Sequence, residues 1–206
     1  MKAPLKIVGI GGTTTSGSST ELALAIALRA AANEGAVVEA FSGEELSRLP
    51  HYAAGAADDN DVARRLLQSI REANGLIIAS PGYHGSISGL VKNAIDYTEE
   101  TVKDERVYLE GLPVGVIATA YGWQATGSTL AALRAIVHAL RGWPTPMGAA
   151  IRSSKGLFVD GACQDPSVVA QLELVGRQVV EFAALRQLSL GITATSSMVT
   201  PEMIAQ

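Results

Sequence analysis

The alternation of short apolar runs with helix-periodic segments constrains the fold of this chain more than any other feature. Residues Leu5 to Ile10 form a continuous apolar run with β-branched members, which is typical of a strand buried on both faces. Similar runs predict further strands at residues 36–41, 76–80 and 113–119, and a weak strand within 147–158. The third strand is expected to end at Pro81 and Gly82.

Helices are predicted between these strands. Ser18 and Glu21 have the spacing of a capping box, and apolar residues then recur every four positions until a glycine C-cap at Gly35. The same kind of spacing predicts helices from the acidic cluster 58–61 to about residue 70, and at residues 88–98, 130–140 and 168–182. Residues 42–60 are expected to form a long loop.

Five strands, each followed by a helix, predict an α/β fold with a doubly wound five-stranded parallel sheet and helices on both faces. Ligands of such folds bind beyond the carboxyl ends of the strands, near the switch in strand order. The loops that follow the strands are therefore the segments where function is expected.

Composition excludes several classes of protein. The chain has 206 residues, a formal net charge of −4 and one cysteine, Cys163. This length fits one domain, the charge gives no broad footprint for nucleic acid, and a single cysteine forms no disulfide within the chain. There is no signal-peptide pattern, no apolar stretch long enough to span a membrane and no His/Cys cluster for a metal, so a soluble cytoplasmic protein without a metal site is expected.

The loop after the first strand, residues 11–20, is rich in hydroxyl groups and opens a helix. Free backbone N–H groups and the helix dipole attract a phosphate at such a position. No Lys or Arg lies between Lys6 and Arg29, so the loop is not the lysine-containing P-loop of nucleotide hydrolases. The candidate phosphate-binding residues are Thr13, Thr15, Ser18, Ser19 and Thr20.

Two other interpretations of this loop remain open. Gly9 and Gly11 give the first two glycines of a dinucleotide-binding fingerprint, although Thr14 holds the third position. Glu39, at the end of the second strand, would then bind a ribose of NAD(P). Alternatively, the loop is a Ser/Thr-rich helix cap that binds nothing.

The loops after the third and fourth strands offer aromatic side chains and exposed backbone N–H groups, which suit a flat, polar heterocycle. The candidate residues of the first of these loops are Pro81, Gly82, Tyr83, His84, Gly85 and Ser86. Those of the second loop are Thr119, Tyr121, Gly122 and Trp123. His84 either hydrogen-bonds the ligand or is an exposed loop histidine, and His138 is expected to lie at a contact between helices.

Residues 81–96 carry a long motif through Pro81, Tyr83, Gly85, Ser86, Gly89, Lys92, Asn93 and Asp96. This pattern resembles the Pro-x-Tyr-Asn-Gly-Ser-x-x-Gly-x-x-Lys-Asn-x-x-Asp motif of the NAD(P)H-dependent FMN reductase family, which has a flavodoxin-like fold. The first loop resembles the phosphate loop of that family, and the alternation of elements agrees over most of residues 5–186. Two departures stand out: Thr14 or Thr15 replaces the family's phosphate-loop arginine, and His84 replaces its asparagine.

The resemblance implies an enzyme that binds FMN and transfers a hydride from the nicotinamide C4 of NAD(P)H to the flavin N5, with no catalytic side chain required. Electrons would pass to a quinone-type acceptor, or reduced flavin would supply a partner monooxygenase. It also implies a flavodoxin-like FMN-binding domain at residues 1–190 with a C-terminal tail at 191–206, in a homodimer or homotetramer whose contacts involve residues 97–112 and the tail. A flavodoxin-like electron carrier and an NAD(P)-binding protein that uses Glu39 are the alternatives.

Overall fold

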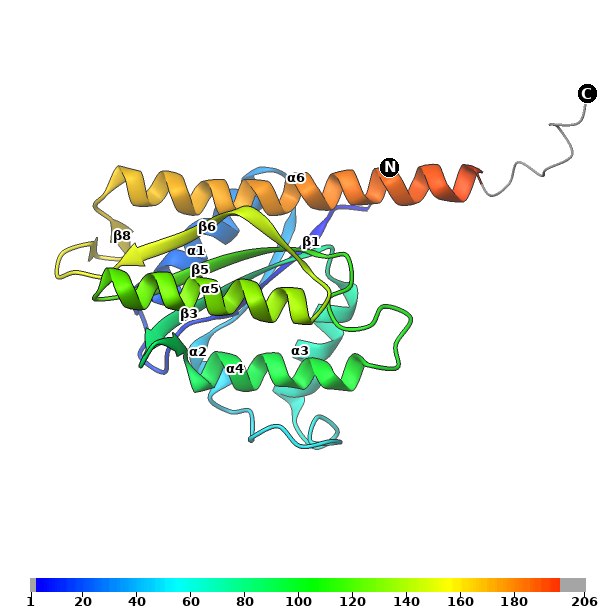
Figure 1. Cartoon of the computed structure of the whole chain (residues 1–206), viewed down its shortest axis with the longest axis horizontal. Helices are drawn as coiled ribbons and strands as arrows, with labels where there is room; N and C mark the ends of the chain where they lie inside the picture. The colour runs from blue at the N-terminus through cyan, green and yellow to red at the C-terminus, as the bar shows by residue number, and fades with distance from the viewer. Residues whose placement is uncertain (1–2, 197–206) are drawn as a thin grey trace, which may run out of the picture.

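The computed structural model describes the backbone of residues 3–196 and the side chains of residues 3–190. Its centre is a parallel sheet with the strand order β2-β1-β3-β5-β6 (Figure 1). The strands are β1 (Lys6–Gly11), β2 (Val37–Phe41), β3 (Gly75–Tyr83), β5 (Pro113–Ala120) and β6 (Trp143–Arg152). This is the flavodoxin-like order, with a switch point between β1 and β3, so the predicted fold class is confirmed.

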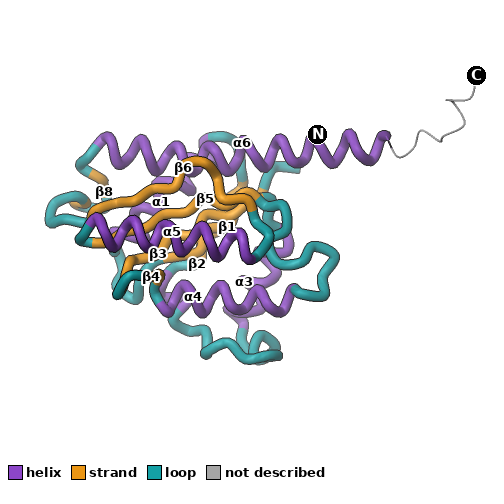
Figure 2. The backbone as a smooth tube through the Cα atoms, in the orientation of Figure 1, coloured by secondary structure: helices purple, strands orange, loops and turns teal. Residues whose placement is uncertain are grey.

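Helices cover both faces of the sheet (Figure 2). They are α1 (Ser19–Asn33), α2 (Gly43–Leu46), α3 (Asp61–Glu72), α4 (Gly89–Asp96) with the 3-10 turn η1 (Tyr97–Thr101), α5 (Trp123–Ala139) and α6 (Pro166–Ser196). One face packs against α1 and α6, and the other packs against α3, α4 and α5. Side chains alternate between the two faces, so Ile7 and Ile77 join one core cluster while Val8 and Ile78 join the other.

The predicted start of α1 is correct, but its cap differs in one detail. The Ser18 hydroxyl accepts a hydrogen bond from the Glu21 N–H, as a helix cap does. The Glu21 carboxylate reaches one residue further back than a capping box requires, and accepts the N–H of Gly17 at 2.8 Å. Glu21 therefore stabilises the loop itself.

The expectation of an unbroken loop at residues 42–60 is wrong. Residues 43–46 form the short helix α2, which begins with a full capping box between Ser42 and Glu45. The Ser-x-x-Glu spacing is enough to start a short helix here, although the segment has no long run of apolar residues at helical spacing. The remainder of the segment lies outside regular helix or strand and leads to Asn60, whose side chain caps α3.

The expectation that the third strand ends at Pro81 is also wrong, because β3 continues to Tyr83. Pro81 pairs with Thr119 at the last position of the parallel ladder with β5. A missing N–H removes little hydrogen bonding at the end of a ladder. Beyond Pro81 the strand turns into a hairpin with β4 (Ser86–Ile87), which is antiparallel.

The fifth main strand, β6, begins at Trp143 and ends at Arg152, earlier than the 147–158 range predicted. Pro144 and Pro146 obscured its start in the sequence. An edge strand tolerates proline because one of its sides has no neighbour to bond. A small hairpin of β7 (Phe158–Val159) and β8 (Ala162–Cys163) follows.

The last helix is longer than expected. α6 continues through Gly191 to Ser196 and so crosses the boundary placed between residues 190 and 191, whereas residues 197–206 of the predicted tail lie outside the described residues. Within segment 97–112, Tyr97, Leu109 and Leu112 are buried in the core and not free for subunit contact, whereas Val102 is 40% exposed. Among the described helices, none combines the length and hydropathy needed to cross a membrane.

Candidate functional site

The loops after β1, β3 and β5 meet at the carboxyl edge of the sheet, on the left in Figure 1. The loops after β1 and β3, together with the start of α4, surround a cavity of about 150 Å³ at the switch point between β1 and β3. The cavity is lined by Gly12, Thr13, Thr14, Pro81, Tyr83, Ser88, Gly89 and Leu90. Thr13, Pro81 and Tyr83 were predicted site residues, and the structure brings them together from two loops.

The loop between β1 and α1 presents neutral hydrogen-bond donors. Thr14, Thr15 and Ser16 are exposed, while Ser18 and Ser19 are half-buried. The first N–H groups of a helix have no acceptor within the helix, so those of Ser19 and Thr20 are available to a ligand. The arrangement is that of an anion cradle at a helix N-terminus.

This cradle carries a negative charge of its own. The Glu21 carboxylate is held at the N–H of Gly17, within the loop, and no arginine side chain belongs to the loop to offset it. A phosphate placed here would bind through N–H and hydroxyl groups alone. Its affinity should therefore be lower than in a site that contains an arginine.

The loop after β3 is a two-residue hairpin turn. His84 and Gly85 both have positive φ angles, of 51° and 87°, as in a type I′ turn. Asparagine adopts this backbone conformation more readily than most residues, which explains why an Asn-Gly pair suits the position. His84 occupies the exposed tip of the turn, next to the cavity residue Tyr83.

Three large aromatic side chains are exposed at this edge. Tyr83 is 53% exposed, Tyr121 is 84% exposed and Trp123 is 65% exposed. A Cβ atom added at Gly85 or Gly122 would meet nothing within 4 Å, so the backbone beside these aromatics is open. Exposed rings next to open backbone N–H groups are suited to binding a planar heterocycle.

Three predicted contact residues do not line the cavity and are packed against other parts of the protein. The hydroxyls of Thr20 and Thr119 are buried and lie 2.6 Å apart in a hydrogen bond. Gly82 packs so tightly that an added Cβ atom would lie 2.6 Å from the Thr129 hydroxyl of α5. The Thr20 and Thr119 hydroxyls are thus bonded to one another, while the backbone N–H of Thr20 at the start of α1 remains available to a ligand.

Sequence reasoning missed two groups of residues at this edge. Ser88, Gly89 and Leu90 line the cavity because the hairpin folds the start of α4 back over it. Arg152 ends β6 and donates from Nε to the Tyr121 carbonyl at 3.2 Å, and Lys155 follows it in the same exposed loop. A correct end for β6 would have placed Arg152 at the end of the strand and Lys155 just beyond it, beside the aromatic loop.

Glu39 is not part of this site. Its carboxylate lies 3.0 Å from the Lys6 ammonium and accepts a hydrogen bond from Ser69 of α3 at 2.7 Å. Lys6 is the first residue of β1, so this cluster lies toward the opposite end of that strand from the phosphate loop. The geometry disfavours Glu39 as a ribose-binding acid.

His138 adds nothing to this edge. His138 is exposed, so the predicted contact between helices is wrong. Within the part of the chain that the structure describes, no group of three His, Cys, Asp or Glu side chains is arranged to hold a metal ion.

The residues at the carboxyl edge fit FMN in two respects and depart from an ideal site in one. A helix N-terminus with hydroxyl donors suits the phosphate, and the aromatic side chains around open glycines suit the flavin ring. The cavity of about 150 Å³ is smaller than the roughly 300 Å³ at which ligand pockets begin, so it forms only one wall of a flavin site.

Comparison with known proteins agrees with this geometry. Residues 5–155 match the family model described as NADPH-dependent FMN reductase. The matched region includes the loops after β1, β3 and β5. The chain is 35% identical over 97 residues to the FMN-dependent NADPH-azoreductase of Staphylococcus saprophyticus, covering 45% of this chain and 48% of that protein. It is 33% identical over 118 residues to the enzyme of the same name from Staphylococcus haemolyticus, covering 56% and 59%. The chain thus spans about half the length of the curated relatives that it matches.

Solved structures share the fold at low sequence identity. FerB, a flavoenzyme NAD(P)H:(acceptor) oxidoreductase from Paracoccus denitrificans, superposes with a TM-score of 0.70 at 20% identity, covering 87% of this chain and 97% of that one. A flavodoxin, WrbA-like protein from Agrobacterium tumefaciens gives a TM-score of 0.60 at 14% identity, covering 88% and 98%. The match to the family model extends over well more than half of the sequence, and the chain belongs to the NADPH-dependent FMN reductase family.

Proposed function

We propose that this protein is an NAD(P)H-dependent FMN reductase whose flavin binds at the carboxyl edge of the sheet. The observation that carries the proposal is the meeting of the threonine-lined loop after β1 with Pro81 and Tyr83 after β3 at one cavity. When bound, FMN would supply the hydride chemistry, and the protein would bind, orient and shield it. No side chain is required as a nucleophile or a general base.

In this proposal, the phosphate of FMN lies at the start of α1. The N–H groups of Ser19 and Thr20 and the exposed hydroxyls of the loop would donate to its oxygens. Thr13 and Thr14 line the cavity that connects this position with Tyr83. The absence of a cation in the loop supports a weakly held flavin, which exchanges with free FMN.

The flavin ring would lie over the second and third loops. Tyr83, Tyr121 and Trp123 offer apolar ring faces, and the backbone at Gly85 and Gly122 is open to a polar edge. Backbone N–H groups aimed at a ring that gains negative charge stabilise its reduced form. The hairpin at His84 would hold this part of the site in place.

Arg152 and Lys155 are proposed to bind the phosphates of NAD(P)H. Both are exposed, Arg152 as the last residue of β6 and Lys155 in the loop after it, and Arg152 is oriented by the Tyr121 carbonyl. Guanidinium and ammonium groups at this edge supply the positive charge that the first loop lacks. Replacing both by alanine should raise the KM for NADPH while FMN affinity is retained.

A quinone-type acceptor is proposed to receive the electrons at the same exposed edge. Alternatively, reduced flavin leaves this edge and supplies a partner monooxygenase. Two relatives are named azoreductases, so an azo compound is a further candidate acceptor. We also propose a cytoplasmic location and a homodimer or homotetramer, in which a second copy supplies the missing walls of the shallow flavin site.

The test is an absorbance titration of the purified protein with FMN, followed by NADH and NADPH oxidation assays with and without FMN. Binding of FMN together with FMN-dependent oxidation supports the proposal. FMN binding without NAD(P)H oxidation would favour an electron carrier. NAD(H) binding without any FMN binding would favour a dinucleotide-binding protein.

A further inference from the structure

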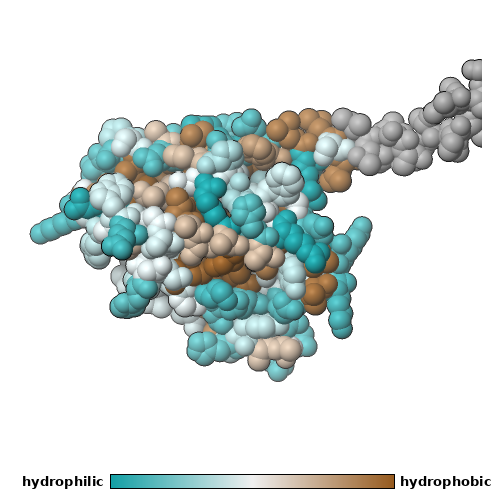
Figure 3. Space-filling model, in the orientation of Figure 1, coloured by the Kyte–Doolittle hydropathy of each residue, from teal (hydrophilic) through white to brown (hydrophobic). Residues whose placement is uncertain are grey.

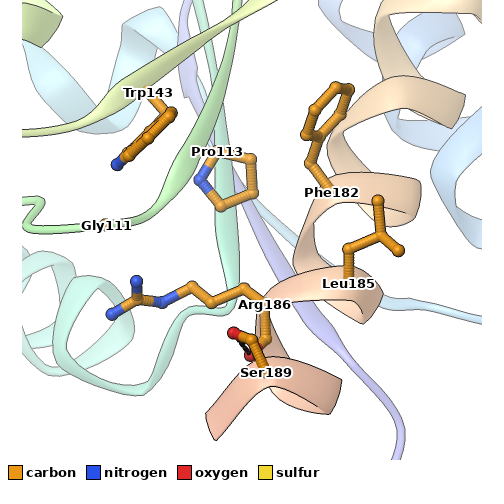
Figure 4. A pocket seen from close by; sticks show the side chains of 7 residues that line it. All are labelled: Gly111, Pro113, Trp143, Phe182, Leu185, Arg186 and Ser189. Atoms are coloured by element: carbon orange, nitrogen blue, oxygen red, sulfur yellow. Dashed lines mark hydrogen bonds between the residues drawn. The ribbon is translucent and has the colours of Figure 1, made fainter.

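A second cavity, of about 330 Å³, lies at the amino edge of the sheet, where β5 and β6 begin. We define the amino-edge cavity by Gly111, Pro113, Trp143, Phe182, Leu185 and Arg186, which line it (Figure 4). β5 is eight residues long, so this cavity lies roughly 25 Å from the flavin loops along the strand. Its volume falls within the range of small-molecule sites.

The amino-edge cavity is amphipathic. Phe182 and Leu185 of α6 form one side, and Figure 4 shows the Trp143 nitrogen and the Arg186 guanidinium on the other side, near Gly111. Trp143 is 69% exposed and Leu185 is 54% exposed, so the apolar surfaces are accessible. Figure 3 shows that the hydrophobic surface continues over the C-terminal part of α6.

Polar donors converge on the guanidinium side. Arg186 makes one long hydrogen bond, of 3.4 Å, to the Glu110 carbonyl. The Trp143 indole N–H has no hydrogen-bond acceptor among the described residues. Gly111 has a φ of +69°, and any side chain added there would collide with the guanidinium, so the glycine allows Arg186 to lie against the backbone.

The charge around the cavity is positive although the whole chain is acidic. Arg186 and Arg106 line an adjoining cleft of about 210 Å³. Burial, and then the charge of Arg186, lowers the pKa of Arg106 below its ordinary value, although Asp104 acts in the opposite direction. Asp104 is bound to Arg71 at 2.7 Å, and Glu110 is paired with Arg141 at 3.7 Å.

Arg106 adds to this positive charge, but its own guanidinium is engaged by backbone carbonyls. Its guanidinium donates to the carbonyls of Ile70, Arg71 and Ala73 at the end of α3. Arg186 is the guanidinium that remains positioned toward the amino-edge cavity. A guanidinium binds a carboxylate or a sulfonate, and an apolar wall beside it binds an attached ring.

We propose that the amino-edge cavity binds a small aromatic anion, with its ring against Trp143 and Phe182 and its carboxylate or sulfonate on Arg186. A second copy of this chain is a poorer occupant. A two-fold contact pairs this patch with the same patch of the other copy, and the residues that line the cavity bring two Arg186 guanidinium groups and no carboxylate to such a contact. Like charges facing across an interface are costly, whereas an anion neutralises the guanidinium.

The proposal is tested by calorimetric titration of the full chain with 2-naphthoate and with the neutral 2-naphthalenemethanol, both in excess FMN. We expect the acid to bind about tenfold more tightly than the alcohol, because a hydrogen bond to a charged group favours the acid. Arg186→Gln should remove this preference. Arg177→Gln, on the exposed surface of the same helix, should keep it.

Leu185→Glu gives an independent check at an exposed position. The new carboxylate should repel the acid and weaken its binding, and it should weaken binding of the alcohol far less. Equal affinity of the acid and the alcohol, or a preference that survives Arg186→Gln, would overturn the proposal. The proposal would also be overturned if neither probe binds the parent protein and Leu185→Glu halves the mass measured by light scattering. That result would make this surface an interface between copies of the chain. FMN binding is read separately by absorbance, so failure of the flavin proposal would be distinguishable.

Discussion

The side-chain oxygens of Thr20 and Thr119 lie 2.6 Å apart, in a buried hydrogen bond that ties the start of α1 to the end of β5. It joins the loop that we assign to the FMN phosphate to the strand whose loop carries Tyr121 and Trp123. Two segments separated by 99 positions in the sequence are thereby held in one arrangement. The bond positions the site and does not itself face the ligand.

Thr20→Val should destabilise the protein by about 1–3 kcal/mol, because it leaves the Thr119 hydroxyl buried without a partner. Thr119→Val should have a similar effect. The double variant should lose much less than the sum of the two, since it removes both polar groups at nearly constant shape. Urea unfolding of the four proteins measures this coupling, and additive losses would show that the hydrogen bond has no energetic role.

The two tryptophans form a matched pair at opposite edges of the sheet, with Trp123 65% and Trp143 69% exposed. Trp123→Leu should weaken FMN binding about tenfold, because it removes an aromatic face from the flavin loops. Trp143→Leu should leave FMN affinity unchanged. Titration by flavin absorbance separates the two, and equal effects of both variants would contradict the assigned site.

The missing arginine gives a gain-of-function test. Thr15→Arg should tighten FMN binding about tenfold through a charge-assisted hydrogen bond to the phosphate. Riboflavin, which lacks the phosphate, should bind equally to the parent protein and the variant. If riboflavin gains as much as FMN, the phosphate does not lie in this loop.

The cluster around Glu39 predicts how stability changes with pH. Burial acts to raise the pKa of the Glu39 carboxyl, but hydrogen bonds from Ser69 and Lys6 and the charges of Lys6 and Arg65 lower it below its ordinary value of 4.5. A lowered folded-state pKa contributes stability above pH 4.5, and this contribution is lost as the pH falls through the folded-state value.

Glu39→Gln should therefore flatten the loss of stability below about pH 4.5 in acid-dependent unfolding experiments. Lys6→Gln should flatten it partly, because it removes one of the favourable charges. The KM for NADPH should be the same in Glu39→Gln as in the parent protein. A large rise in that KM would restore Glu39 as a ribose-binding acid.

The sequence predicts the layers of the fold well because buried parallel strands and amphipathic helices leave strong periodic patterns. Val8 and Ile10 belong to such a run, and the Ser18 cap marks the start of α1 within a residue. The errors in the strand boundaries fall where proline hides a strand. Pro81 ends a parallel ladder and Pro144 lies in an edge strand, two places where a missing N–H is tolerated.

The candidate site is predicted less completely, because its geometry depends on contacts between distant segments. The turn at His84 and Gly85 lacks the Asn-Gly signal of a type I′ hairpin, so neither the hairpin nor the cavity position of Leu90 follows from the sequence. Thr20 and Thr119 look like ligand contacts in their loops, and only the fold shows that they bond to one another.

The central claim is that FMN bound at the loops after β1, β3 and β5 is reduced by NAD(P)H. The most direct measurement is the visible absorbance of the protein mixed with FMN and then with NADPH under anaerobic conditions. The account predicts a flavin spectrum shifted by binding, followed by its loss on addition of NADPH at a rate that depends on the protein and falls in Trp123→Leu. An unshifted spectrum, with no reduction beyond that of free FMN with NADH or NADPH, would contradict it.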